Sequence, residues 1–149
     1  MPEPLPTNDP PVFMRDYRIA VDPQWRVTVP SAWRFAQRAE LFIRVKKNHL
    51  VVMPRSEVER FRAKADELDG TNRTALLAAW ARTTDQTKID SAGRITLPKD
   101  WAQQVGIKTG AKVVMAGVTE NFQIWAADQY DNDEGGMQAL GDALLDQYD

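Results

Sequence analysis

The sequence contains no cysteine and a single histidine, His49. These absences exclude a disulfide framework, a thiolate metal site and a cysteine nucleophile, and leave almost no material for a histidine-based metal cluster or a Ser-His-Asp triad. The longest apolar run, Ala75 to Ala81, has seven residues, whereas a membrane span needs about 18. The start, Met-Pro-Glu-Pro-Leu-Pro, lacks the features of a secretory signal. We expect a cytoplasmic non-enzyme without cofactor, metal, small-molecule substrate or membrane partner.

The C-terminal end of the chain carries no Lys or Arg and is strongly acidic. Residues 1–126 hold all 19 Lys and Arg against 14 acidic residues, while residues 127–149 hold seven acidic residues and no Lys or Arg. The net charge of -2 therefore averages a mildly basic body and an acidic tail. A basic body is compatible with a nucleic-acid partner.

An internal repeat organises the chain. The segment 22–33 aligns without a gap on 90–101, at an offset of 68, and five of the twelve positions are identical: the Asp, Arg, Thr, Pro and Trp. A later segment, 50–54, aligns on 122–126 at an offset of 72. Two copies indicate a domain with pseudo-two-fold symmetry rather than a solenoid, which needs three or more repeats.

The hydrophobic pattern predicts a mainly β protein with short helices, of the α+β class. Val27 and Val29 alternate with polar residues, as do Ile95 and Leu97, and this period of two is typical of half-buried strands. We expect a flexible, Pro-rich arm at 1–12, a first repeat at 13–69, a linking helix at 70–84, a second repeat at 85–127, and an acidic, partly helical tail at 128–149.

The repeated Asp-x-x-x-Arg motif is the candidate for chemistry. Asp90 begins a turn, Gly93 is free to adopt a positive φ, and Arg94 starts the strand; Asp22 and Arg26 hold the matching positions. A guanidinium held by its Asp offers a planar set of donors suited to phosphate or to the edge of guanine. The alternative is that each pair is only a surface salt bridge that closes its own turn.

These residues resemble the MraZ family, within the AbrB/MazE swapped-hairpin group of bacterial transcription factors. The resemblance rests on the two motifs, a short helix between them and the Phe-x-Ile-Trp strand after the second, and it runs from about Phe13 to Trp125. It implies a pseudo-two-fold swapped-hairpin β-barrel made of two tandem AbrB-like repeats. Chains would form a ring homo-oligomer.

The resemblance also implies a function. The protein would be a nucleoid-associated, sequence-specific regulator that binds double-stranded DNA at short G-rich direct repeats upstream of the division and cell-wall gene cluster. Arg26 and Arg94 would contact the DNA, while Asp22, Asp90 and Gly93 would orient the loops.

The first motif departs from the family pattern. Trp25 stands where glycine is expected before Arg26, and a positive φ would strain a tryptophan. Pro23 suits a type I turn that would let Trp25 keep a negative φ, with its side chain packed on its own chain, a neighbouring subunit or DNA. Arg15 replaces the family's N-terminal glycine. Arg94 is therefore a better candidate than Arg26 for reading bases.

Further cations are candidates for phosphate contacts. The first choices are Arg18, Lys88 and Lys99, and a wider set in the first copy includes Arg34 and Arg38; any of these could also be an ordinary solvated charge. The acidic tail could compete with DNA or only keep the protein soluble. An alternative function is an antitoxin-like or ring-scaffold interaction protein without operator binding.

Overall fold

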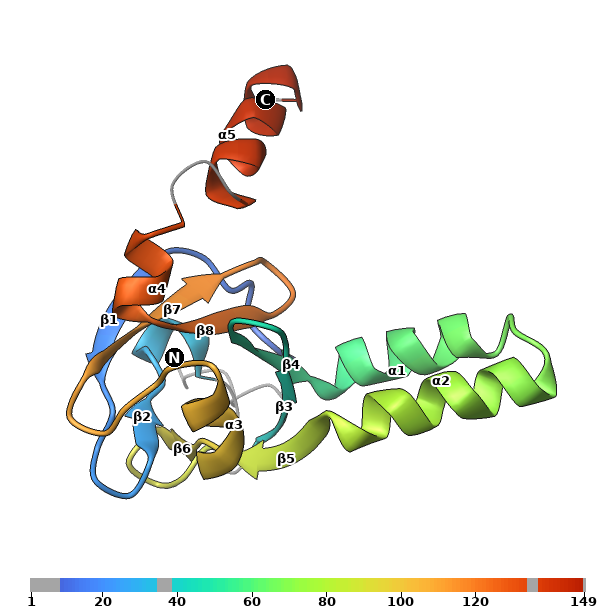
Figure 1. Ribbon diagram of the computed structural model, residues 1–149, viewed down its shortest axis with the longest axis horizontal. Helices are drawn as coiled ribbons and strands as arrows, with labels where there is room; N and C mark the ends of the chain where they lie inside the picture. The colour runs from blue at the N-terminus through green and yellow to red at the C-terminus, as the bar shows by residue number, and fades with distance from the viewer. Residues whose placement is uncertain (1–8, 35–38, 134–136, 149) are drawn as a thin grey trace, which may run out of the picture.

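The computed structural model describes residues 9–34, 39–133 and 137–148 (Figure 1). Most of the predicted arm, Arg38 and part of the acidic tail therefore lie outside the described residues. The elements of the first repeat are β1 (Asp16–Ala20), β2 (Arg26–Thr28), the 3-10 helix η1 (Ser31–Trp33), β3 (Glu40–Val45), β4 (Leu50–Pro54) and α1 (Arg55–Ala65). They are followed by α2 (Gly70–Arg82), β5 (Thr84–Lys88), β6 (Arg94–Thr96), α3 (Lys99–Gln104), β7 (Lys112–Gly117), β8 (Phe122–Ala126), α4 (Ala127–Asp131) and α5 (Met137–Tyr148).

The sheet order shows how the two repeats interlock. Strands β1 to β4 correspond to β5 to β8 at the offsets found in the sequence, and the six-stranded antiparallel sheet runs β1-β7-β8-β4-β3-β5. Exchanging each strand for its counterpart reverses this order and leaves every pairing intact. The first strand of each repeat pairs with a strand of the other repeat, β1 with β7 and β5 with β3. Neither repeat completes the sheet alone.

A separate two-stranded antiparallel ribbon, β2–β6, joins one short strand from each repeat. β2 contacts β1, and β6 contacts β5, so the ribbon lies beside both edge strands of the large sheet. The pairings among the described residues leave the six-stranded sheet open rather than hydrogen-bonded into a closed barrel. The predicted α+β class, with mostly antiparallel strands and short helices in a swapped arrangement, is confirmed.

One hydrophobic core fills the space between the sheet and the ribbon. Trp33 lies against Phe122 with ring centroids 4.8 Å apart, and Phe13 meets the edge of Trp33 at 5.7 Å. The inward residues of the ribbon, Val27 and Ile95, are 1% and 0% exposed. Burying one large apolar side chain contributes about 1.5–3 kcal/mol, so this core fixes the ribbon against the sheet.

Two helical segments leave the β body (Figure 1). The α1–α2 hairpin extends to one side and is held by the stacked rings of Phe61 and Trp80, 5.1 Å apart. Helix α2 begins after Asp69, whose side chain accepts the Asn72 amide as an N-cap. Helix α5 projects from another side of the body. No helix in the described ranges has both the length and the apolar character needed to cross a bilayer.

Candidate nucleic-acid interface

The two motif loops share one backbone design. In the first, the Trp25 amide donates to the Asp22 carbonyl at 3.0 Å, and the Asp22 amide donates to the Arg26 carbonyl at 3.0 Å. The second repeats these bonds, from Gly93 to Asp90 at 2.9 Å and from Asp90 to Arg94 at 2.8 Å. This pattern is a turn whose fourth residue has a positive φ, followed by a bulge, as in three-residue hairpin loops.

Each Asp holds its Arg at two points. Asp22 Oδ1 accepts the Arg26 amide at 2.8 Å, and Oδ2 accepts Nε at 2.7 Å. Asp90 Oδ1 accepts the Arg94 amide at 2.8 Å, and Oδ2 accepts Nε at 3.1 Å. The carboxylate binds Nε in both cases, which orients the guanidinium and leaves its terminal Nη groups without a hydrogen bond to that carboxylate.

The ribbon brings both arginines to one face. Arg26 lies opposite Thr96, and Arg94 lies opposite Thr28. Residues directly opposite each other in an antiparallel pair point to the same side, and here that is the side away from the buried Val27–Ile95 pair. The two arginines are diagonal neighbours, whose Cα atoms are about 7–8 Å apart in such ladders. A single ligand can therefore reach both.

The arginines are partly exposed and their Asp partners are ionised. The side chains of Arg26 and Arg94 are 30% and 33% exposed. Burial acts to raise the pKa of Asp22, but hydrogen bonds from the Arg26 amide, the Arg26 guanidinium and the Gln24 amide outweigh it and leave that pKa below its usual value. The pKa of Asp90 is also lowered, chiefly by the Arg94 amide. Both loops hold their arginines by a charge-assisted contact.

Trp25 adopts a positive φ of 62°, so the prediction that Pro23 would keep its φ negative is wrong. The matching Gly93 has a φ of 79°. Both turns need a positive φ at this fourth position, because it leads the chain from the turn back into the strand. In the first loop, the packing of the Trp25 indole against the main core stabilises this conformation. Arg15, the other residue expected in place of a glycine, also has a positive φ, of 74°.

Two contacts at the loops were not predicted from the sequence. Gln24 Oε1 accepts a hydrogen bond from Arg26 Nη2 at 3.2 Å, so the first guanidinium has an additional partner. The guanidinium of Arg34 lies over Gly93, and its Nε donates to the Val29 carbonyl at 2.9 Å. The sequence indicated Arg34 only as one cation among several, because nothing in the pattern links it to a loop 59 positions away.

The predicted phosphate contacts differ in their surroundings. Lys88 ends β5 and Lys99 begins α3, and both are exposed on either side of the second motif. Arg18 lies on β1, where its two Nη groups donate to the Asp131 carboxylate at 2.6 and 3.2 Å. Arg18 is therefore already paired with Asp131 of the acidic tail, and a phosphate would have to displace this carboxylate.

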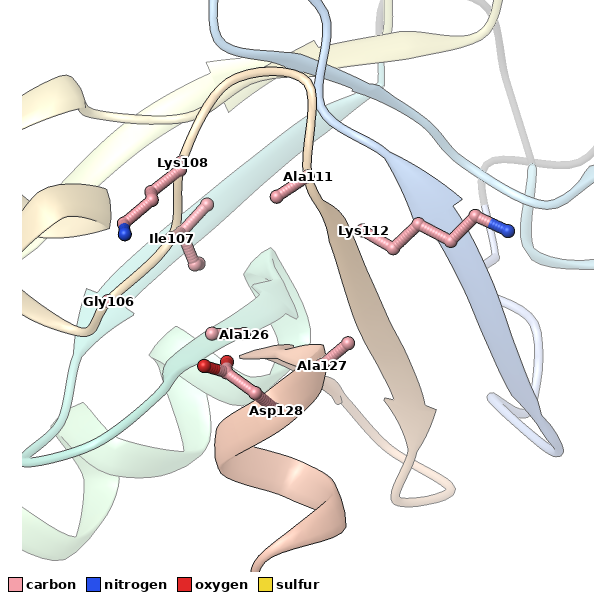
Figure 2. A pocket seen from close by; sticks show the side chains of 8 residues that line it. All are labelled: Gly106, Ile107, Lys108, Ala111, Lys112, Ala126, Ala127 and Asp128. Carbon is pink, nitrogen blue, oxygen red and sulfur yellow. The ribbon is translucent and has the colours of Figure 1, made fainter.

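A hollow of about 340 Å³ lies between the loop before β7 and the start of α4 (Figure 2). Lys108 and Asp128 lie on its rim, and Lys112 points away from it. Its other lining residues are glycine, alanine and isoleucine, so it pairs no nucleophile with a base. In the described ranges, no group of three or more His, Asp or Glu residues is arranged to hold a metal ion.

Comparisons with known proteins agree with this architecture. The family model described as "Antidote-toxin recognition MazE, bacterial antitoxin" matches residues 86–121, which contain the second motif. The "Transcriptional regulator MraZ" of Mycobacterium ulcerans (strain Agy99) is 31% identical over 122 residues, covering 80% of this chain and 84% of the relative. The protein of the same name from Mycobacterium tuberculosis (strain ATCC 25618 / H37Rv) is 29% identical, covering 81% and 85%. The Thermus thermophilus protein of that name is 25% identical, covering 77% and 82%. With this identity over most of both chains, the protein belongs to the MraZ family of transcriptional regulators.

Proposed function

We propose that this chain is a sequence-specific DNA-binding regulator that places Arg26 and Arg94 in the major groove. The observation that carries the proposal is their position on one exposed face of the β2–β6 ribbon, each held by its own Asp. The major groove admits a two-stranded β-ribbon, and an arginine that binds guanine O6 and N7 contributes about 1–3 kcal/mol of discrimination. The names of the MraZ relatives support a regulatory role.

The proposed target is a set of short G-rich direct repeats, engaged by a ring of chains. A body with few surplus positive charges binds weakly as a single unit, but several ribbons on one rigid assembly gain strongly from effective concentration. Head-to-tail contacts between identical chains close into a ring when the rotation is right. Light scattering of the purified protein tests the assembly, and a monomer at micromolar concentration would contradict the ring.

The decisive experiment is a gel shift with duplex DNA from immediately upstream of the gene, compared with a scrambled duplex of equal length. Wild type should prefer the upstream duplex, and Arg94→Ala should remove most of the preference, since each lost base contact costs about 1–3 kcal/mol. Arg82→Ala, at the C-terminal end of α2 just before β5, is the matched control. An unaltered preference in Arg94→Ala would overturn the assignment of Arg94.

A second candidate function is an interaction protein without operator binding, and the match to the MazE antitoxin model favours it. That match ends at residue 121, before the acidic tail and α5. The same gel shift separates the two functions. Equal and weak binding of wild type to both duplexes at low salt would favour the second.

A further inference from the structure

We infer that the two loops of this chain are not equivalent, and that Arg34 joins Arg94 in a two-arginine DNA site at the second loop. This inference rests on the proposed function and deepens it. Arg94 would read a base edge, and Arg34 would bind the adjacent phosphate. The first loop would provide a single guanidinium.

The position of Arg34 is fixed by the second loop itself. A Cβ built on Gly93 would lie 2.6 Å from Arg34 Nε and 2.7 Å from Nη1, so the guanidinium covers the bare backbone of the loop. Its Nε donates to the Val29 carbonyl, and the Val29 amide donates to the Gly93 carbonyl at 2.8 Å. These contacts hold the Arg34 guanidinium against Gly93, the residue that precedes Arg94 in the chain.

The terminal nitrogens of both arginines are available to a ligand. Arg34 is an exposed residue, and in the described ranges no acceptor bonds to its Nη groups or to those of Arg94. Two positively charged groups at one loop strengthen its attraction for the phosphates of a DNA backbone. Arginine suits this role because its planar donors bind phosphate in a bidentate manner.

The first loop has the opposite arrangement of large and small residues. At the repeat offset of 68, Trp25 corresponds to Gly93, and Ala102 corresponds to Arg34. The indole of Trp25 packs on the core cluster that includes the fully buried Ala102. The residue that corresponds to Arg34 at the first loop is therefore not a cation, and Gln24 already engages the Arg26 guanidinium. Each loop is thus covered by one large side chain, Trp25 at the first loop and Arg34 at the second. Only at the second loop does this side chain add a guanidinium group.

The test measures how DNA affinity depends on salt, because each neutralised phosphate contributes about 0.9 to the slope of log K against log salt. Fluorescence anisotropy would use the upstream and scrambled duplexes from about 50 to 200 mM salt, the range over which phosphate contacts lose affinity. Arg34→Gln can still donate to the Val29 carbonyl but lacks the charge. It should lower the slope by at least about 0.9 and weaken both duplexes alike, whereas Arg34→Lys should keep the wild-type slope.

A second variant tests the geometry without changing the charge. Gly93→Ala should displace the Arg34 side chain and lower the slope in the wild-type background, but should change it little in the Arg34→Gln background. A wild-type slope for Arg34→Gln would overturn the inference while leaving the proposed function intact. Equal binding of wild type to the two duplexes would instead refute the proposed function.

Discussion

Asp90 binds Arg94 twice, accepting its amide at 2.8 Å on one carboxylate oxygen and its Nε at 3.1 Å on the other. The backbone bond fixes where the strand begins, and the side-chain bond fixes where the guanidinium points. Asp22 and Arg26 repeat the arrangement in the other half of the chain. Recognition of a base edge depends on such orientation, because a freely rotating arginine loses entropy when it binds.

Replacing Asp90 by Asn should therefore weaken DNA binding more than it weakens the fold. The asparagine of this variant can still accept the turn amides through its side-chain carbonyl, but its NH₂ group cannot accept from Arg94 Nε. We expect the preference for the upstream duplex to fall by roughly tenfold, since a hydrogen bond to a charged group contributes about 1.5–3 kcal/mol. Anisotropy titrations measure this, with Asp85→Asn on β5 as the control. An unchanged preference would show that Arg94 needs no carboxylate to orient it.

The same contacts predict how stability depends on pH. Asp22 and Asp90 have pKa values below the usual 3.8 in the folded chain. A carboxylate with a depressed folded pKa contributes stability that is present above its unfolded pKa and is lost as the pH falls through its folded pKa. The double variant Asp22→Asn, Asp90→Asn should therefore lose less stability than wild type between about pH 5 and pH 2. Urea unfolding at each pH measures the difference, and parallel curves would contradict it.

Much of the fold follows from the sequence because the duplication constrains both halves at once. The aligned segments 22–33 and 90–101 become the two loops, the two ribbon strands and the helical turns after them. The four additional residues of the second copy fall between Trp101 and β7, where α3 extends further than η1. Pairing between repeats is not visible in the pattern, because period-two alternation defines the face of a strand but not its neighbour.

The candidate site could be predicted only in part. The Asp and Arg positions were visible because they repeat, whereas the conformation of Trp25 was not, since tertiary packing overrides a local steric preference. The role of Arg34 at Gly93 and the pairing of Arg18 with Asp131 join residues 59 and 113 positions apart. A single sequence carries no information about contacts at that separation.

Trp25 offers a test of backbone strain that is independent of DNA. Trp25→Gly and Trp25→Ala both remove the indole, but only glycine adopts a positive φ without cost. We expect Trp25→Gly to be more stable than Trp25→Ala by about 1 kcal/mol, the cost of a left-handed conformation for a residue with a Cβ. Both should be less stable than wild type, because the indole packs on the core. Urea unfolding measures this, and a more stable alanine variant would show that the loop changes conformation.

His49 should remain neutral well below the usual titration range of histidine. Its ring stacks on Trp125 at 4.4 Å, and burial, together with the charge of nearby Lys46, lowers its pKa to about 4. In the unfolded chain the imidazole binds a proton at about pH 6.5. The free energy of unfolding should therefore fall as the pH drops from about 6.5 to 4, because only the unfolded chain is protonated in that range. NMR titration of the only imidazole in the chain measures the pKa directly. His49→Phe should flatten that part of the stability curve, and a midpoint at the ordinary value of about 6.5 would contradict the prediction.

The acidic tail should limit DNA binding through the segment next to β8 more than through α5. Asp131 accepts hydrogen bonds from Arg18, and the Tyr130 hydroxyl donates to Asp16 at 2.7 Å, so these two contacts attach α4 to β1. The described side chains of α5 from 138 to 148 are all exposed. Truncation after Asp133 removes α5 and should leave the free energy of unfolding unchanged. Truncation after Ala127 should destabilise the fold by about 1–2 kcal/mol, because the buried part of Tyr130 is lost.

The two truncations also separate two effects of the tail on DNA. Both remove negative charge and should raise affinity for the scrambled duplex at low salt, and screening should abolish the gain at high salt. Only truncation after Ala127 releases Arg18, so it should also increase the salt slope by about 0.9 for each phosphate that Arg18 then binds. Asp131→Asn in the full chain should reproduce that increase with six of the seven tail acids still present. Equal slopes for wild type, Asp131→Asn and both truncations would mean that Arg18 contacts no phosphate and that Asp131 only anchors α4.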